Sequence, residues 1–216
     1  TCAMQSFGQD KDTIPVNNTT DKIDSARSSA TTIGGGMDFN YAKTEKYILG
    51  PIRIEGADNF DPQAIKLIPQ ESRPKILHQS GASQCDSVQN LYKKLDVEAT
   101  VVSFIDNTAE AFADADLIIC RAGASTVTEI AGIGAAALFV PLPSAVDDHQ
   151  TVNAEFLVSQ QAAWLMPQSH LKPTALAEFI QSINRGQLLQ AAVNAYALRK
   201  TGAAHDVVTA CEEVTA

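Results

Sequence analysis

A run of four apolar residues that ends in a turn of small residues constrains this chain more than any other feature. The run is Leu117–Cys120, and its unbroken apolar character is typical of a strand that is buried on both faces of a parallel sheet. Gly123 and Ala124 follow in the turn, and Ser125 opens a stretch with helical character. The sequence therefore predicts a helix that starts at the carboxyl end of a buried strand.

A helix start in this position suits a nucleotide diphosphate. The first N–H groups of a helix lack partners within the helix, and the helix dipole places partial positive charge there. The hydroxyl groups of Ser125 and Thr126 add donors, and the carboxylate of Glu129, one turn further on, is placed to accept hydrogen bonds from ribose hydroxyls. Thr126 and Glu129 also fit a capping box, which only closes a helix start. Both interpretations stay open, because open α/β sheets bind ligands at such helix starts.

A second strand and helix start follow along the chain. Residues 135–143 form an apolar run that prolines end, and Asp148 is a candidate N-cap for the next helix. Gln150 and Asn153 are three residues apart and share a face of that helix, where their amide groups suit the hydroxyls of a sugar. Ordinary solvated helix surface is the alternative interpretation for these two residues.

The wider pattern predicts an α/β fold with a Rossmann-like parallel sheet and helices on both faces. Residues 1–45 are polar, lack periodicity and are predicted to be a disordered or atypical extension, and residues 46–216 are predicted to be one domain. The chain begins with Thr, shows no signal peptide, and is interpreted as a fragment or processed product. Apart from the two pairs of strand and helix start described above, strands are predicted at 75–78, 99–104 and 163–166. Helices are predicted at 65–68, 83–95, 108–113, 154–161, 173–184, 187–200 and 205–214.

Composition narrows the classes of function. The chain has 216 residues with 45% hydrophobic, which fits a globular protein, and no apolar window is long enough to span a membrane. The formal net charge of -9 argues against nucleic acid or an anionic membrane surface as a partner. The cysteines are far apart and predict reduced thiols in the cytoplasm, and the histidines form no metal-like cluster. Asp114 and Asp116 mimic a metal-binding carboxylate pair, but they precede a strand, and no cofactor or divalent cation is indicated.

Several motifs share their order and spacing with one family. They are Arg73-Pro74, His78-Gln79-Ser80-Gly81, Phe104-Ile105-Asp106, and residues 120–129, 138–141 and 147–154. With these motifs, residues 64–214 resemble the carboxyl-terminal, donor-binding domain of the MurG family, one half of a GT-B-type glycosyltransferase. The family transfers GlcNAc from UDP-GlcNAc to the undecaprenyl-pyrophosphoryl-MurNAc-pentapeptide lipid (lipid I) of bacterial cell-wall synthesis.

The resemblance implies a role for particular residues. His78 ends a predicted strand and is expected to be structural. By the resemblance, backbone groups of Ile105 contact the uracil, and Glu129 contacts the ribose. The diphosphate contacts are expected at Ala124, Ser125 and Thr126, and the GlcNAc contacts at His149, Gln150 and Asn153.

The chain also departs from the family pattern. Relatives carry a Gly-Gly-Ser loop that by spacing falls on residues 49–56, where only Gly50 agrees. The amino-terminal acceptor domain, which supplies a glycine-rich loop and the histidine usually proposed as general base, is missing. Residues 34–36 are three glycines that resemble part of such a loop, but the following residues do not, and a flexible linker is expected. The resemblance therefore implies no catalytic residue in this chain.

Three functional hypotheses follow. The first is the donor half of an inverting glycosyltransferase, inactive alone, whose intact form is cytoplasmic and peripheral on the inner face of the bacterial plasma membrane. The second is a related UDP-GlcNAc epimerase, which the motif at residues 148–153 disfavours. The third is a non-catalytic fragment that binds a nucleotide sugar.

Overall fold

The computed structural model describes residues 31–33, 37–39, 52–55, 60–143 and 148–215, and the chain divides into two units, residues 1–44 and 45–216. In the first unit, strand β1 (Thr31–Ile33) pairs antiparallel with β2 (Met37–Phe39). The sequence did not predict these strands. The glycines at 34–36, expected to be a flexible linker, lie outside the described residues.

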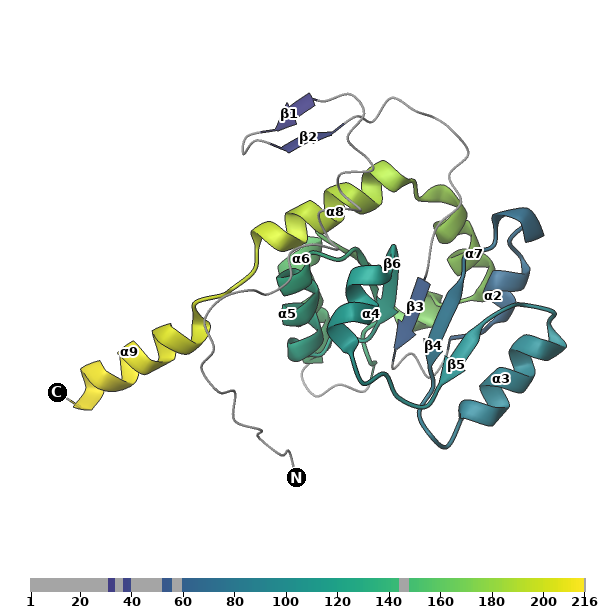
Figure 1. Ribbon diagram of the computed structural model, residues 1–216, viewed down its shortest axis with the longest axis horizontal. Helices are drawn as coiled ribbons and strands as arrows, with labels where there is room; N and C mark the ends of the chain where they lie inside the picture. The colour runs from purple at the N-terminus through teal and green to yellow at the C-terminus, as the bar shows by residue number, and fades with distance from the viewer. Residues whose placement is uncertain (1–30, 34–36, 40–51, 56–59, 144–147, 216) are drawn as a thin grey trace. The chain divides into compact units, whose positions relative to one another are not determined.

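The second unit is built on a parallel sheet of six strands in the order β5-β4-β3-β6-β7-β8. Figure 1 shows β5, β4, β3 and β6 side by side in this order. This confirms the predicted α/β fold. The strand β6 is buried at all four positions because it lies inside the sheet with a core on each face. The strands are β3 (Ile52–Glu55), β4 (Ile76–Gln79), β5 (Thr100–Val102), β6 (Leu117–Cys120), β7 (Ala137–Phe139) and β8 (Trp164–Leu165).

Alternating side chains divide the unit into two cores. Leu117 and Ile119 of β6 belong to one core, and Ile118 and Cys120 belong to the other. The first core is covered by α2 (Gln63–Lys66), α3 (Cys85–Lys94) and α7 (Pro173–Ser182), the second by α4 (Thr108–Asp114), α5 (Ala124–Ile133) and α6 (His149–Val158), and α8 (Arg185–Ala197) contributes to both.

The remaining elements are short or exposed. Two 3-10 turns, η1 (Gln70–Ser72) and η3 (Gln168–His170), connect larger elements, and α9 (Ala203–Thr215) is exposed over residues 203–214. In the described part of the chain, no helix has both the length and the apolar character that crossing a membrane requires.

The strand order fixes where a ligand is expected. The chain proceeds outward from β3 to β4 and β5, and then returns to place β6 on the other side of β3. Such a sheet has a switch point between β3 and β6, and open α/β sheets bind ligands outside the carboxyl ends of the strands at this point. The loop after β6 and the start of α5 lie there. The loop after β3, at 56–59, is outside the described residues, as are residues 49–51 and 56 of the altered Gly-Gly-Ser region, whereas its residues 52–55 form β3.

The predicted elements agree with the structure in type and differ at their ends. Helix α6 begins at His149, directly after the predicted N-cap Asp148, and ends at Val158, three residues before the end of the span predicted at 154–161. Helix α5 ends at Gly134 in the left-handed conformation (φ 73°), where an added Cβ would lie 2.9 Å from Cβ of Tyr196 on α8. That position therefore requires glycine, both for its backbone angle and for the close approach of the two helices.

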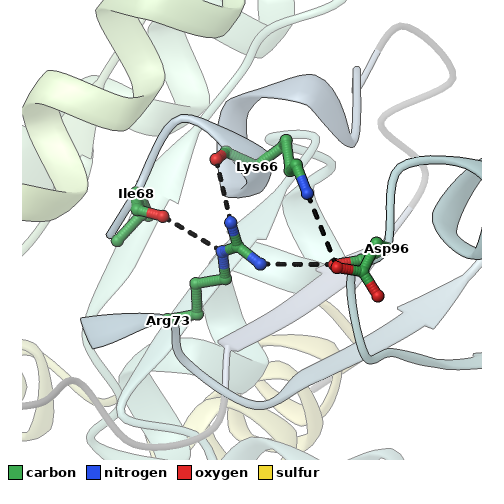
Figure 2. A network of polar contacts seen from close by, with 4 residues as sticks. All are labelled: Lys66, Ile68, Arg73 and Asp96. Carbon is green, nitrogen blue, oxygen red and sulfur yellow. Dashed lines mark hydrogen bonds and ion pairs between the residues drawn. The ribbon is translucent and has the colours of Figure 1, made fainter. Parts of the chain in front are cut away.

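Hydrogen bonds from Arg73, here called the Arg73 clamp, join the end of α2 to the turn after α3 (Figure 2). The guanidinium group donates from Nε to the carbonyl of Ile68 (3.0 Å), from Nη2 to that of Lys66 (3.2 Å) and from Nη1 to that of Asp96 (3.2 Å). The ammonium of Lys66 lies 3.7 Å from a carboxylate oxygen of Asp96. Arg73 thus binds carbonyls at the end of α2 and just after it, and it holds the turn that follows α3.

We expect Arg73→Ala to lower the free energy of unfolding by about 1–3 kcal/mol, because several carbonyls lose a charged donor. Urea denaturation measures the loss. Arg73→Lys should recover only part of the stability, since an ammonium cannot reproduce the planar fork. Lys75→Ala, which removes an exposed cation two positions away, is the control, and an equal loss in that variant would contradict the clamp.

Candidate functional site

The start of α5 presents unpaired backbone donors at the switch point. Helix α5 begins at Ala124 with Gly123 as its N-cap, and the first bond within the helix is donated by the N–H of Val127 to the carbonyl of Gly123 (3.0 Å). The N–H groups of Ala124, Ser125 and Thr126 therefore have no partner within the helix. Ala124 and Ser125 are exposed, and Thr126 is half-buried.

The capping-box interpretation of Thr126 and Glu129 is wrong. Thr126 is the third residue of α5, whereas a capping box requires it at the N-cap position, which Gly123 occupies. No side chain among the described residues caps the start of α5. Glu129 is exposed one turn further along the helix, as predicted from its spacing. The donors at this helix start are therefore left for a ligand or solvent.

Arg121 fixes the loop before α5 to the neighbouring strand. Its Nη1 donates to the carbonyls of Val140 (3.0 Å) and Pro141 (3.2 Å), which follow β7. Sequence reasoning included Arg121 in a motif without giving it a role. A cation inside a run of small residues is the signal that could have indicated a tie between loops.

Gln150 and Asn153 of α6 bind the same two loops. The N–H of Leu142 donates to Oε1 of Gln150 (2.9 Å), and Nδ2 of Asn153 donates to the carbonyl of Ala122 (3.1 Å). Both side chains are half-buried, so they are not ordinary solvated helix surface. The structure therefore brings them to the edge of the sheet where Ala124 begins α5. In each side chain, one atom of the amide group is hydrogen-bonded to the backbone.

The start of α6 differs from the prediction in detail. Asp148 is the N-cap, as predicted, but it has a left-handed backbone (φ 53°) and its side chain caps no backbone N–H. Its Oδ1 accepts a hydrogen bond from the hydroxyl of Thr151 (2.7 Å). His149 is exposed as the first residue of the helix. Residues 144–147, which lead into it, lie outside the described residues.

The loop after β5 is held by the end of β4. Ile105 is half-buried, and its N–H donates to Oε1 of Gln79 (3.0 Å). The N–H of Ser80 donates to the carbonyl of Val102 (3.0 Å), where the loop begins. Phe104, between these two anchors, is 64% exposed. Sequence reasoning placed Ile105 at this edge of the sheet but gave no role to Gln79.

His78 is buried beneath this edge. Its Nδ1 lies 3.2 Å from the hydroxyl of Tyr92, and the rings of Phe60 and Tyr92 meet its ring edge to face at centroid distances of 5.6 and 5.9 Å. Burial lowers the pKa of His78 to about 4 and raises the pKa of Tyr92. His78 is therefore neutral near pH 7 and packs the core, which agrees with its predicted structural role.

A cavity of about 310 Å³ lies between α4 and the sheet, beside the loop after β5. Arg53 lines it, packs over the ring of Phe112 at 4.4 Å and donates from Nη1 to the carbonyl of Thr108 (3.3 Å). Of the predicted site residues, only Ile105 borders the cavity. Its other lining residues come from β3, β4 and α4, so we attribute the cavity to packing beside α4. Among the described residues, no group of three or more His, Cys, Asp or Glu could hold a metal ion.

Comparison with known proteins gives the site a family context. Residues 56–208 match the model described as the glycosyltransferase family 28 C-terminal domain. The chain is 52% identical over 165 residues to a protein of Albidiferax ferrireducens and 56% identical over 165 residues to one of Polaromonas naphthalenivorans. Both are named UDP-N-acetylglucosamine--N-acetylmuramyl-(pentapeptide) pyrophosphoryl-undecaprenol N-acetylglucosamine transferase. These matches cover 76% of this chain and 42% and 46% of the relatives, so the chain spans less than half of their length.

Solved structures agree with this placement. The crystal structure of Acinetobacter baumannii MurG superposes with a TM-score of 0.70 at 38% identity, over 82% of this chain and 55% of that chain. The glycosyltransferase VinC, solved in complex with dTDP, superposes with a TM-score of 0.54 at 17% identity, over 76% of this chain and 42% of that chain. The second match shows only that the fold is shared. All of the predicted site residues lie within the matched family region.

The lowered pKa of His78 predicts a loss of stability in acid. The unfolded chain takes up the proton near the ordinary pKa of 6.5, whereas the folded chain does so only near 4, so the stability present at neutral pH declines as pH falls from about 6.5 to 4. Between pH 7 and pH 5 the loss from this group is about 2 kcal/mol.

Urea denaturation at several pH values measures this effect against His78→Gln, which keeps a polar partner for Tyr92 and does not titrate. The variant should lose distinctly less stability than the wild type between pH 7 and pH 5. His170→Gln, at an exposed position, should follow the wild type. Parallel curves for wild type and His78→Gln would refute the proposed cause.

Proposed function

The chain belongs to glycosyltransferase family 28, whose C-terminal domain its residues 56–208 match, and from this premise we propose that it is the donor-binding half of an inverting transferase that uses UDP-GlcNAc. The observation that carries the proposal is the start of α5. Three consecutive N–H groups without partners in the helix lie where a doubly wound sheet binds its ligand.

The diphosphate binds at this helix start. Residues Ala124, Ser125 and Thr126 offer their N–H groups, and the hydroxyls of the last two add donors. The chain has a formal net charge of -9, so the attraction for phosphate comes from these local dipoles and not from a basic surface. The pyrophosphate then projects the two ends of the nucleotide sugar to either side of β6.

The two sides of the site differ in polarity, and this difference orients the ligand. The loop after β5 offers the exposed ring of Phe104 and the backbone of Ile105, which suit a flat base. The opposite side offers the amides of Gln150 and Asn153, which suit hydroxyl groups. The uracil therefore lies toward β5 and the GlcNAc toward α6, with the ribose hydroxyls at the carboxylate of Glu129.

The hydrogen bonds of the amides define which atoms meet the sugar. Oε1 of Gln150 and Nδ2 of Asn153 bind the backbone of the loops. The Nε2 donors of Gln150 and the Oδ1 acceptor of Asn153 are then the groups that contact the GlcNAc hydroxyls. His149, exposed one position before Gln150, lies near the same sugar.

The reaction requires a second half. The acceptor hydroxyl attacks the anomeric carbon from the face opposite UDP, the bond from that carbon to the UDP oxygen breaks, and a general base takes the hydroxyl proton. The α5 start stabilises the charge that develops on the departing diphosphate. Among the residues described here, His78 is buried and neutral, His149 lies on the proposed donor side, and His170 and His205 lie on η3 and α9, outside the site motifs. The base is therefore supplied by an acceptor domain, as in a GT-B enzyme.

The names of the relatives suggest the acceptor. They act on an N-acetylmuramyl-(pentapeptide) pyrophosphoryl-undecaprenol, so we assign the same lipid-linked acceptor (lipid I), and hence the formation of lipid II for peptidoglycan, to the intact protein of which this domain is a part. Because that lipid resides in a membrane and UDP-GlcNAc in the cytoplasm, the intact protein works at the inner face of the bacterial plasma membrane.

Glu129→Ala should weaken UDP-GlcNAc binding by about 1.5–3 kcal/mol, or roughly 10- to 150-fold, because a charged acceptor of the ribose hydroxyls is lost. Isothermal titration calorimetry measures this change. Glu155→Ala, an exposed carboxylate on α6, should bind like the wild type. Unchanged affinity in Glu129→Ala would remove Glu129 from the site.

Gln150→Glu separates recognition of the sugar from support of the loop. A glutamate keeps an oxygen for the N–H of Leu142 but lacks the Nε2 donors, so affinity for UDP-GlcNAc should fall by about 3- to 10-fold more than affinity for UDP. Gln160→Glu, which adds the same charge at an exposed position near the end of α6, controls for electrostatics. Equal losses for both ligands would contradict the assignment of Gln150 to the sugar.

Because the chain matches less than half of the length of its relatives, we expect it to bind the donor without catalysing transfer. The purified 216-residue chain should bind UDP-GlcNAc and transfer no GlcNAc to the lipid-linked acceptor. Transfer should appear when the acceptor domain of a relative is fused to it. Robust transfer by the chain alone, measured with radiolabelled donor, would show that it holds its own base.

A further inference from the structure

We propose that Gln79 is a positioning residue for recognition of the base. It holds the loop after β5 in the shape that meets a uracil, and this role rests on the function proposed above. The side chain comes from the last residue of β4, and its partner, the N–H of Ile105, lies 26 positions further along the chain. The contact therefore joins two strand ends that only the folded sheet brings together.

The loop is anchored at both ends by consecutive residues of β4 and the turn after it. Ser80 binds the carbonyl of Val102, where β5 ends, and Gln79 binds the N–H of Ile105 at 3.0 Å. The two residues between these anchors, Ser103 and Phe104, are exposed. The loop thus presents a short exposed segment on a fixed base, which lowers the conformational entropy that a ligand must remove on binding.

The far side of Ile105 is fixed as well. Asn107 caps α4 by accepting a hydrogen bond from the N–H of Glu110 (3.2 Å), and its Nδ2 donates to Oε2 of Glu110 (2.9 Å). Ile105 is therefore held between Gln79 and a capped helix start. No described residue donates a hydrogen bond to the carbonyl of Ile105. This carbonyl is the backbone group left to meet a base.

A fixed carbonyl discriminates between pyrimidines. Uracil carries an N3–H donor, whereas cytosine carries a lone pair at N3, so a carbonyl aimed at N3 binds the first and repels the second. Sites built to bond a ligand N–H reject analogues that lack it, provided that the acceptor is held in place. Gln79 supplies that constraint, although it need not touch the base. Its loss should therefore reduce selectivity as well as affinity.

The test uses the full chain, UDP and CDP as ligands, and the amide resonance of Ile105 in a ¹H–¹⁵N NMR spectrum. Gln79→Met keeps the volume and removes the acceptor. It should shift the Ile105 resonance, weaken UDP binding by about 3- to 10-fold, and lower the UDP-to-CDP affinity ratio by a similar factor. Gln79→Glu retains an acceptor oxygen and should keep the wild-type ratio. Gln89→Met, the same change at a half-buried position on α3, should alter none of these values.

The outcomes separate this inference from the proposed function. If wild-type protein binds neither UDP nor UDP-GlcNAc, the proposed function fails and this role of Gln79 fails with it. If wild type binds UDP and Gln79→Met shifts the Ile105 resonance but keeps the wild-type ratio, the function stands and the positioning role alone is overturned. A dispersed spectrum confirms that each variant is folded. If Gln79→Met does not fold, the UDP-to-CDP affinity ratio of Gln79→Glu is compared with that of wild type, and a changed ratio in that variant would contradict the positioning role.

Discussion

The parallel pairing of β3 with β6 is the constraint on which the rest of the site depends. Ile52 lies opposite Leu117 and Ile54 opposite Ile119, and all four side chains pack into one core. This pairing exists because the chain leaves β5 and crosses back over the sheet, and it creates the switch point at the carboxyl ends of both strands. The loop after β6 therefore delivers the start of α5 to the place where a ligand has access to unpaired N–H groups.

Side chains that the sequence suggests for ligand binding also hold the loops around the site. Gln150 and Asn153 each bind a backbone group with one end of the amide, and Arg121 joins the loop before α5 to the end of β7. Small residues leave the backbone accessible, as the proposed diphosphate site requires, but they also give these loops few side chains to pack. Long polar side chains from neighbouring elements supply the missing restraint, so substitutions here affect the site even where no ligand is touched.

The sequence predicts those features that are encoded locally. The bounds of β6 follow from Leu117–Cys120 because a strand buried on both faces has no polar position, and the helix start at Ala124 follows from the small residues beside it. The anchor of Ile105 on Gln79 could not be predicted, since 26 residues separate the partners and neither type is unusual. The N-cap of α6 at Asp148 also follows from the sequence, but the left-handed backbone of that residue does not, because it depends on the loop that leads into the helix.

The restraints described for the donor side form a nearly self-contained set. The hydrogen bonds that tie its loops join residues between Gln79 and Asn153, at the ends of β4 and β5, in the loops after β6 and β7, and on α6. These restraints therefore form once the sheet has folded. The transfer step of the proposed function differs, because its base must reach a hydroxyl on the side of the anomeric carbon opposite the proposed diphosphate site. A two-domain enzyme can thus preorganise its donor site in one half while an acceptor half supplies the base.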